Sequence, residues 1–131
     1  YNPDFDIEKL DFTSGAVLSS PSDLYLSLRW IGILAGRSGC SLAASTGVHD
    51  GTGLIKQLLA GSDAVEIAST VYKNGNGQIR LMLDELETWM KHKEFDSIGA
   101  FKGLMSQVKS GNPATYERVQ FMKYFRGFQG Q

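Results

Sequence analysis

The sequence contains only one cysteine, Cys40, in 131 residues. A single thiol cannot form an internal disulfide, so packing rather than cross-linking has to stabilise the fold. This cysteine usage fits a reducing compartment, and we predict a cytoplasmic protein. We expect Cys40 to be a small buried hydrophobic residue and not a catalytic base.

The sequence also lacks a long apolar run and an excess of one charge. No run approaches the ~20 apolar residues that a membrane-spanning helix needs. The 13 basic and 14 acidic residues give a net charge of −1, with no block of one sign. We therefore predict neither nucleic acid nor a membrane as a partner. His49 and His92 are far apart, and no cysteine accompanies either one, so we predict no metal site.

Short apolar runs alternate with amphipathic ones along the middle of the chain. Residues 40–45 and 63–69 are apolar and bounded by turn residues, which is typical of strands buried on both faces. Apolar residues at helical spacing predict helices after Ser22-Asp23, over about 54–59, and from about Gln78. Helices that alternate with strands through short loops indicate parallel βα units.

The two ends of the chain have weaker patterns. Residues 1–21 show no sustained period, so we expect a loop with one short strand near 15–19. A short helix near 97–105 and a longer one starting at Pro113, capped by Asn112, are expected to follow the βα units. Two strands cannot make a self-sufficient parallel sheet covered on both faces, so we expect a fragment of a larger domain.

Glycines and small residues follow both predicted strands. The first strand leads into STGVHDG (45–51), and the second leads into ASTVYKNG (68–75). A parallel strand that feeds a helix places amide N–H groups at the strand's carboxyl end, where the last two βα units of (β/α)8 barrels commonly bind phosphate. Gly47 would allow an anion to approach the backbone closely. A phosphate site and a pair of ordinary tight turns both fit these residues.

Several motifs occur in order along residues 42–103. Gly47-Val48 follows the first strand, Leu58–Ser62 reads LLAGS, Ala68-Ser69 ends the second strand, and Phe101–Gly103 reads FKG. In this order and spacing they resemble the carboxy-terminal third of the class 1 dihydroorotate dehydrogenases, whose motifs are Gly-Gly-Ile, Leu-Leu-x-Gly-Ala, Gly-Thr and a final Gly-Lys. GAVLSSP at 15–21 is similar to the glycine-rich loop after the sixth strand of that family.

The resemblance implies an FMN-binding barrel that oxidises dihydroorotate to orotate in pyrimidine biosynthesis. The expected fold class is α/β, as the C-terminal portion of a (β/α)8 TIM barrel with additional C-terminal helices. The expected organisation is one barrel fragment with a loop or short strand at 1–21, βα units at 22–95 and a helical extension at 96–131. A partial barrel exposes strand edges and apolar surface, so we also expect a homo-oligomer.

The resemblance also implies the contacts to the cofactor. The FMN phosphate would be bound mostly by backbone amides, at Gly15, Ala16, Thr46, Gly47, Val48, Ala68 and Ser69. The general base of the family, a Cys or Ser on an upstream loop, has no counterpart in this sequence. We therefore expect no catalytic residue in this chain, and no activity from the chain alone on a dihydroorotate-like substrate.

Three positions depart from the family pattern. Thr46 replaces a glycine, and a β-branched residue costs on the order of 1–2 kcal/mol if that position needs a positive φ. Gly53 replaces an aspartate that would cap the following helix, and Ala68 replaces a glycine beside the phosphate.

His49 either adds charge to the anion or is an exposed loop residue. Glu66 is expected to need a buried partner.

Two alternatives to the flavoenzyme stay open at this stage. One is a phosphate-binding barrel that acts on a phosphorylated metabolite without flavin. The other is a non-catalytic, self-associating half-barrel module. Phe121, Phe125 and Phe128 recur at i, i+4 and i+7. This aromatic stripe packs either on the chain's own barrel or on a neighbouring subunit.

Overall fold

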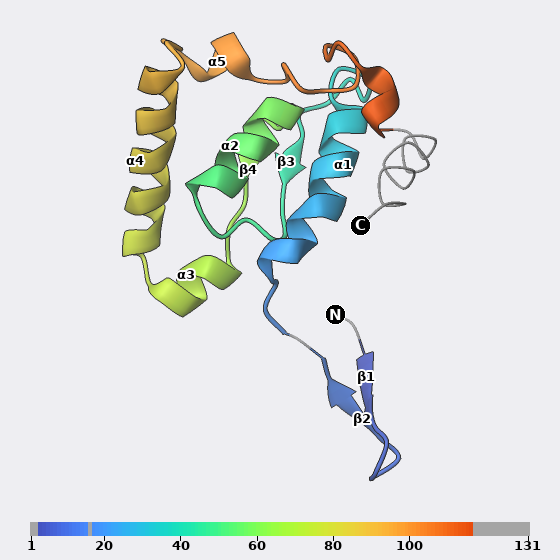
Figure 1. Cartoon of the computed structure of the whole chain (residues 1–131). Helices are drawn as coiled ribbons and strands as arrows, with labels where there is room; N and C mark the ends of the chain where they lie inside the picture. The colour runs from blue at the N-terminus through green and yellow to red at the C-terminus, as the bar shows by residue number, and fades with distance from the viewer. Residues whose placement is uncertain (1–2, 16, 117–131) are drawn as a thin grey trace, which may run out of the picture.

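A computed structural model describes residues 3–15 and 17–116 of the chain (Figure 1). The fold is mixed α/β, with short strands and several helices, and no barrel is closed within these residues. The strands form two separate two-stranded sheets, one antiparallel and one parallel. None of the helices in the described ranges has the length and apolar character needed to cross a membrane.

The parallel pair consists of β3 (Ala43–Ala44) and β4 (Ala64–Val65), joined by helix α2 (Gly51–Ala60). This confirms the predicted βα alternation, although both strands are shorter than expected. At the amino end, the Asp63 carboxylate accepts the Leu42 amide proton at 2.8 Å, so a side chain takes the place of a ladder partner. Beyond Val65, the amide of Glu66 still donates to the Ala44 carbonyl at 2.8 Å.

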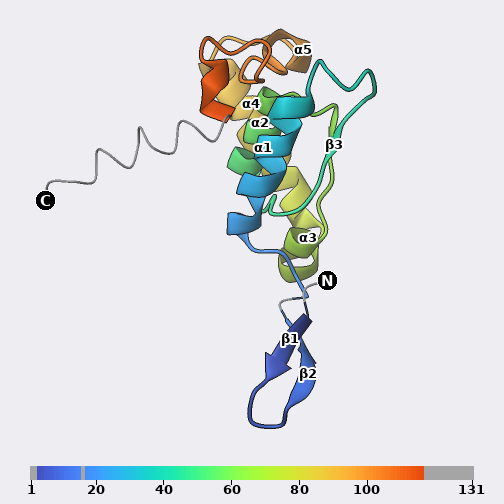
Figure 2. The same cartoon turned by 90° about the vertical axis from the view of Figure 1, so that its right-hand side faces the viewer.

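Helices cover one face of this parallel pair. Helix α2 packs between α1 (Leu24–Leu34) and α4 (Gly77–His92), and the strands lie along one side of the helical layer (Figures 1 and 2). Ala44 points into the core, whereas Ala43, Ala64 and Glu66 are exposed. The expectation of strands buried on both faces is therefore wrong for the described residues.

The predicted burial of Glu66 and of Cys40 is also wrong. Glu66 lies on the uncovered face and reaches solvent, so its carboxylate needs no buried partner. Cys40 precedes β3 in an exposed loop and is not a buried hydrophobic residue. Both residues were predicted to be buried because apolar neighbours surround them in sequence. Their exposure follows from the one-sided cover of the sheet and from the short β3.

The helix ends show how polar side chains set the boundaries. Asp50 caps α2 by accepting the Gly53 amide proton at 2.7 Å, so the cap does not depend on an aspartate at position 53. Gly61, with φ of 116°, closes α2 as predicted. Helix α1 starts directly after Ser22-Asp23, as predicted, with Asp23 at its N-cap position. The Asp23 carboxylate does not cap α1 but accepts from the amide and hydroxyl of Ser20, across the 3-10 turn η1 (Pro21–Asp23).

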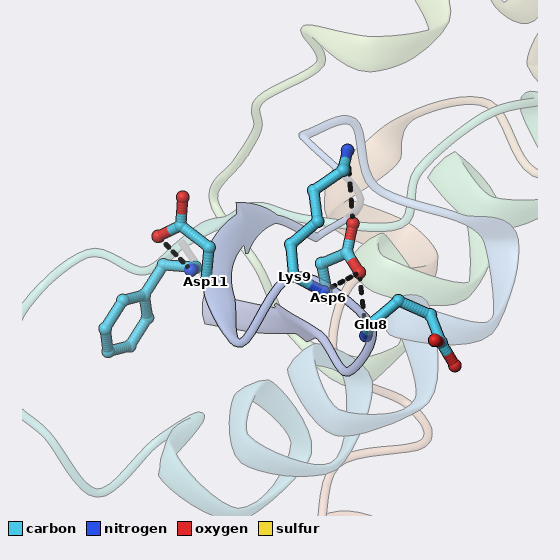
Figure 3. Close-up of polar contacts among 5 residues, drawn as sticks. Asp6, Glu8, Lys9 and Asp11 are labelled. Atoms are coloured by element: carbon cyan, nitrogen blue, oxygen red, sulfur yellow. Dashed lines mark hydrogen bonds and ion pairs between the residues drawn. The ribbon is translucent and has the colours of Figure 1, made fainter.

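The N-terminal segment forms a hairpin instead of the predicted loop with a strand near 15–19. Strand β1 (Pro3–Asp6) pairs with β2 (Asp11–Ser14), and the hairpin extends away from the helices (Figures 1 and 2). In the turn, one carboxylate oxygen of Asp6 accepts the amide protons of Glu8 and Lys9, both at 3.0 Å (Figure 3). The Lys9 amide is the main cause that lowers the pKa of Asp6.

The remaining helices differ from the predicted ones in position or length. Helix α3 (Ser69–Asn74) replaces the turn expected after β4, and α5 (Ile98–Phe101) is a single turn of the helix predicted near 97–105. The expected helix at Pro113 begins as the 3-10 turn η2 (Pro113–Tyr116). The aromatic stripe beyond it and Ala16 lie outside the described residues.

Candidate functional site

Three loops that are distant in sequence meet at the carboxyl ends of β3 and β4. Ser19 lies in the loop before η1, His49 in the loop between β3 and α2, and Ser69 at the start of α3. The amide and the hydroxyl of Ser19 both lie 2.9 Å from Ser69 Oγ. Ser19 Oγ also lies 3.3 Å from His49 Nε2. The structure thus brings together the three segments that the sequence had marked separately.

The turn after β3 has an unusual backbone. Thr46 and Gly47 both have φ of +77°, in the left-handed region that disfavours β-branched residues. A Cβ atom at Gly47 would lie 2.1 Å from the Leu24 amide nitrogen, so this glycine is required by both conformation and space. Val48 is buried and packs with Leu24 and Met82. Its side chain therefore belongs to the core, and only its backbone can face a ligand.

The other predicted site residues differ in exposure and in their distance along the chain from the three contacting residues. Ala68 is exposed and precedes α3, whereas Ser69 is half-buried at its first position. Gly15 is half-buried directly after β2, four residues before Ser19, at the base of the hairpin. Among the described residues, Ser19 rather than Gly15 is the member of this loop that contacts the other two loops.

The first turn of α2 is already occupied by carboxylates. The Gly51 amide donates to Glu85 Oε2 at 2.6 Å, and the Gly53 amide donates to Asp50 Oδ1 at 2.7 Å. By contrast, the amides of Gly47 and Val48 donate to no other residue in the described ranges. Oriented amides of this kind can bind an anion. The Gly51 and Gly53 amides are therefore already engaged, whereas the loop amides of Gly47 and Val48 could bind a phosphate.

Sequence reasoning missed the residues that join these loops. The His49 carbonyl oxygen accepts hydrogen bonds from Thr70 Oγ1 at 2.9 Å and from Gln78 Nε2 at 3.0 Å. Thr70 in turn accepts a hydrogen bond from Asn74 Nδ2 at 3.2 Å. These contacts span 21 and 29 residues of chain, so no local periodicity reveals them. The only sequence signal was the position of Thr70 directly after a strand end.

A second group of motif residues lies at the opposite, amino end of the strands. The Gly103 amide donates to the Leu58 carbonyl at 3.0 Å, which joins the FKG and LLAGS motifs. Lys102 Nζ lies 2.6 Å from Asp63 Oδ1. The hydrogen bond from Lys102, followed by that from the Leu42 amide, lowers the pKa of Asp63. These motifs therefore have a structural role away from the three loops.

Comparison with known proteins shows a distant similarity. The chain is 28% identical, over 87 residues, to the dihydroorotate dehydrogenase B (NAD(+)) catalytic subunit of Thermoplasma volcanium. This supports a distant relationship to the dihydroorotate dehydrogenases. The matched region covers 66% of this chain and 29% of that subunit, so the chain spans less than a third of its relative. No protein-family model matches the sequence.

The positive φ at Thr46 gives a test of the turn geometry. We predict that Thr46→Gly raises the free energy of unfolding by about 1 kcal/mol, because it removes the clash between Cβ and the following carbonyl oxygen. Urea denaturation of the variant and the wild type measures this difference. Thr88→Gly, in the exposed middle of α4, is the control and should be destabilising. A loss of stability in Thr46→Gly would contradict the left-handed turn.

Proposed function

We propose that this chain supplies the phosphate-binding loops of a dihydroorotate dehydrogenase-like flavoprotein. In this proposal the whole protein is an FMN-dependent oxidoreductase that converts dihydroorotate to orotate in pyrimidine biosynthesis. The similarity to the Thermoplasma volcanium subunit supports an oxidoreductase at a coarse level. The observation that carries the proposal for this chain is the convergence of Ser19, His49 and Ser69. Beside them lie the Gly47 and Val48 amides, which have no acceptor among residues 3–15 and 17–116.

The residues at the three loops fit a phosphate group. Gly47 and Val48 would donate amide protons to its oxygens. Ser69, at the start of α3, contacts Ser19, which in turn lies close to His49 of the same loop as Gly47 and Val48. Carboxylates close to this place are engaged by donors: Asp50 by the Gly53 amide and Glu85 by the Gly51 amide. This engagement reduces their repulsion of an anion.

The arrangement also fits the place of phosphate sites in barrel enzymes. Such sites commonly use the loops after the last two strands together with a short extra helix. Here α3 is a short helix between β4 and the long α4, and its first residue contacts the loop that precedes η1. In this proposal β3 and β4 take the places of the last two barrel strands.

The chain is proposed to bind and orient, not to carry out the oxidation. FMN, when bound, supplies the hydride acceptor. Cys40 lies before β3, at the amino end of the parallel pair, whereas the three loops lie at the carboxyl end. That position does not suit a base acting at the loops. The base and the electron acceptor would come from outside this chain, which would be inactive alone.

Flavin binding tests the proposal directly. We predict that the chain binds FMN more tightly than riboflavin, which lacks the phosphate, and that inorganic phosphate competes with FMN. Ser69→Glu should weaken FMN binding by about tenfold or more, because it places a carboxylate at the loops. Fluorescence titration measures both effects. Thr88→Glu adds the same charge on an exposed face of α4 and should leave binding unchanged.

Two outcomes would decide against this assignment. Equal affinity for FMN and riboflavin would contradict a phosphate site at these loops. Tighter binding of sugar phosphates than of FMN would favour the alternative phosphate-binding barrel without flavin.

Exposed apolar surface favours self-association as a second, separate property. Phe5, Leu10 and Phe12 of the hairpin are 62%, 90% and 72% exposed, and the outer face of β3 and β4 is uncovered. Clustered apolar surface and free strand edges drive association. We propose that the chain forms a homo-oligomer through these surfaces.

Sedimentation velocity tests this proposal. We predict a mass above that of a monomer for the wild type and a lower mass for Phe5→Ser/Phe12→Ser. The variant Phe121→Ser/Phe125→Ser examines the aromatic tail in the same way. A monomeric wild type would contradict self-association, and an unchanged mass in the hairpin variant would exclude the hairpin as the contact surface.

A further inference from the structure

The His49 carbonyl oxygen lies where two structural units of the chain are joined. It belongs to the loop between β3 and α2, whereas both of its donors belong to the unit formed by α3 and α4. Thr70 and Gln78 approach the same oxygen at 2.9 and 3.0 Å. Two donors use both lone pairs of a carbonyl, so this acceptor is fully satisfied within the protein.

Thr70 is the central residue of this network. It is 0% exposed. Its hydroxyl donates to the His49 carbonyl oxygen and accepts from the side-chain amide of Asn74. Hydrogen bonds arranged in such a chain strengthen one another in a buried setting. Removal of the hydroxyl would therefore leave the His49 carbonyl with one donor fewer, whereas the exposed Asn74 side chain can bind water instead.

The backbone pairing of β3 with β4 does little to fix the loop after β3 relative to the start of α3. Strands β3 and β4 pair over only two residues each, and Glu66 makes the last backbone contact on the way to the tips. Beyond that point, Thr70 and Gln78 of the α3–α4 unit donate side-chain hydrogen bonds to the His49 carbonyl of the β3–α2 loop, and Val48 of the same loop packs against Met82 of α4. Together these contacts hold the β3–α2 loop, which contains Gly47 and Val48, against the unit that begins at Ser69.

We propose that Thr70 and Gln78 are positioning residues, which hold the two phosphate-binding loops in register through the His49 carbonyl. This inference rests on the proposed function for its consequence, because correctly placed amides would bind an anion more tightly. Neither side chain is required to contact the ligand. Their role is to keep the amides of the two loops directed at one place before any ligand binds.

Thr70→Val and Gln78→Met remove the donors with little change in side-chain size. We expect amide exchange at Gly51 and Tyr72, which donate hydrogen bonds in the two joined units, to accelerate by about tenfold in each variant. Exchange at the Lys93 amide, at the far end of α4, should stay unchanged. Affinity for FMN should fall by a similar factor of about ten.

Two further variants separate positioning from general stability. Thr70→Ser keeps the hydroxyl and should restore both exchange and FMN affinity. Thr88→Val removes a threonine hydroxyl that donates to the Asp84 carbonyl at 2.8 Å on an exposed part of α4, and it should change neither quantity. The circular dichroism spectrum of each variant shows whether it has folded, and Gln78→Met provides a second test if Thr70→Val does not fold.

The outcomes distinguish this inference from the proposed function. If the wild type does not bind FMN but Thr70→Val accelerates exchange, the proposed function fails and the positioning role stands. If the wild type binds FMN and both donor variants bind it equally well with unchanged exchange, the positioning role is overturned. Acceleration that is equally large at Lys93 would also overturn it, because that result indicates global destabilisation.

Discussion

The left-handed turn at Thr46-Gly47 is the constraint on which the rest of this structure depends. It directs the chain past the start of α1, where Gly47 lies so close to the Leu24 amide that no side chain fits. From there, Val48 enters the core, His49 presents its carbonyl to Thr70 and Gln78, and Asp50 caps α2. A single turn thus sets the packing of α1, the start of α2 and the position of the candidate site.

The sequence was informative where structure depends on neighbouring residues. The alternation of helix and strand, the closure of α2 by Gly61 and a turn at Gly47 all follow from local periodicity or from the properties of glycine. The hairpin was missed because its strands are short and largely exposed, with Phe5 and Phe12 packing mainly on each other. The role of Thr70 was missed because its acceptor lies 21 residues away.

The motifs that carry the resemblance divide between the two ends of the parallel strands. At the amino end, the FKG and LLAGS motifs contact each other through Gly103 and Leu58, and they stabilise the framework. At the carboxyl end, the turn after β3 and the start of α3 form the candidate site. The motifs that pack the framework and the loops of the candidate site therefore lie at different ends of the strands. The framework can persist while the site changes, which fits a distant relationship at 28% identity.

The central claim is that backbone amides from two loops face one anion. The most direct measurement is a titration of the ¹⁵N-labelled chain with FMN, followed by amide chemical shifts. We expect the amide resonances of Gly47, Val48 and Ser69 to shift together and to saturate with one dissociation constant. The resonances of Gly51 and Gly53, whose amides are bound to carboxylates, should shift little. Shifts that spare the Gly47, Val48 and Ser69 amides, or separate saturation of the two loops, would contradict a shared anion site.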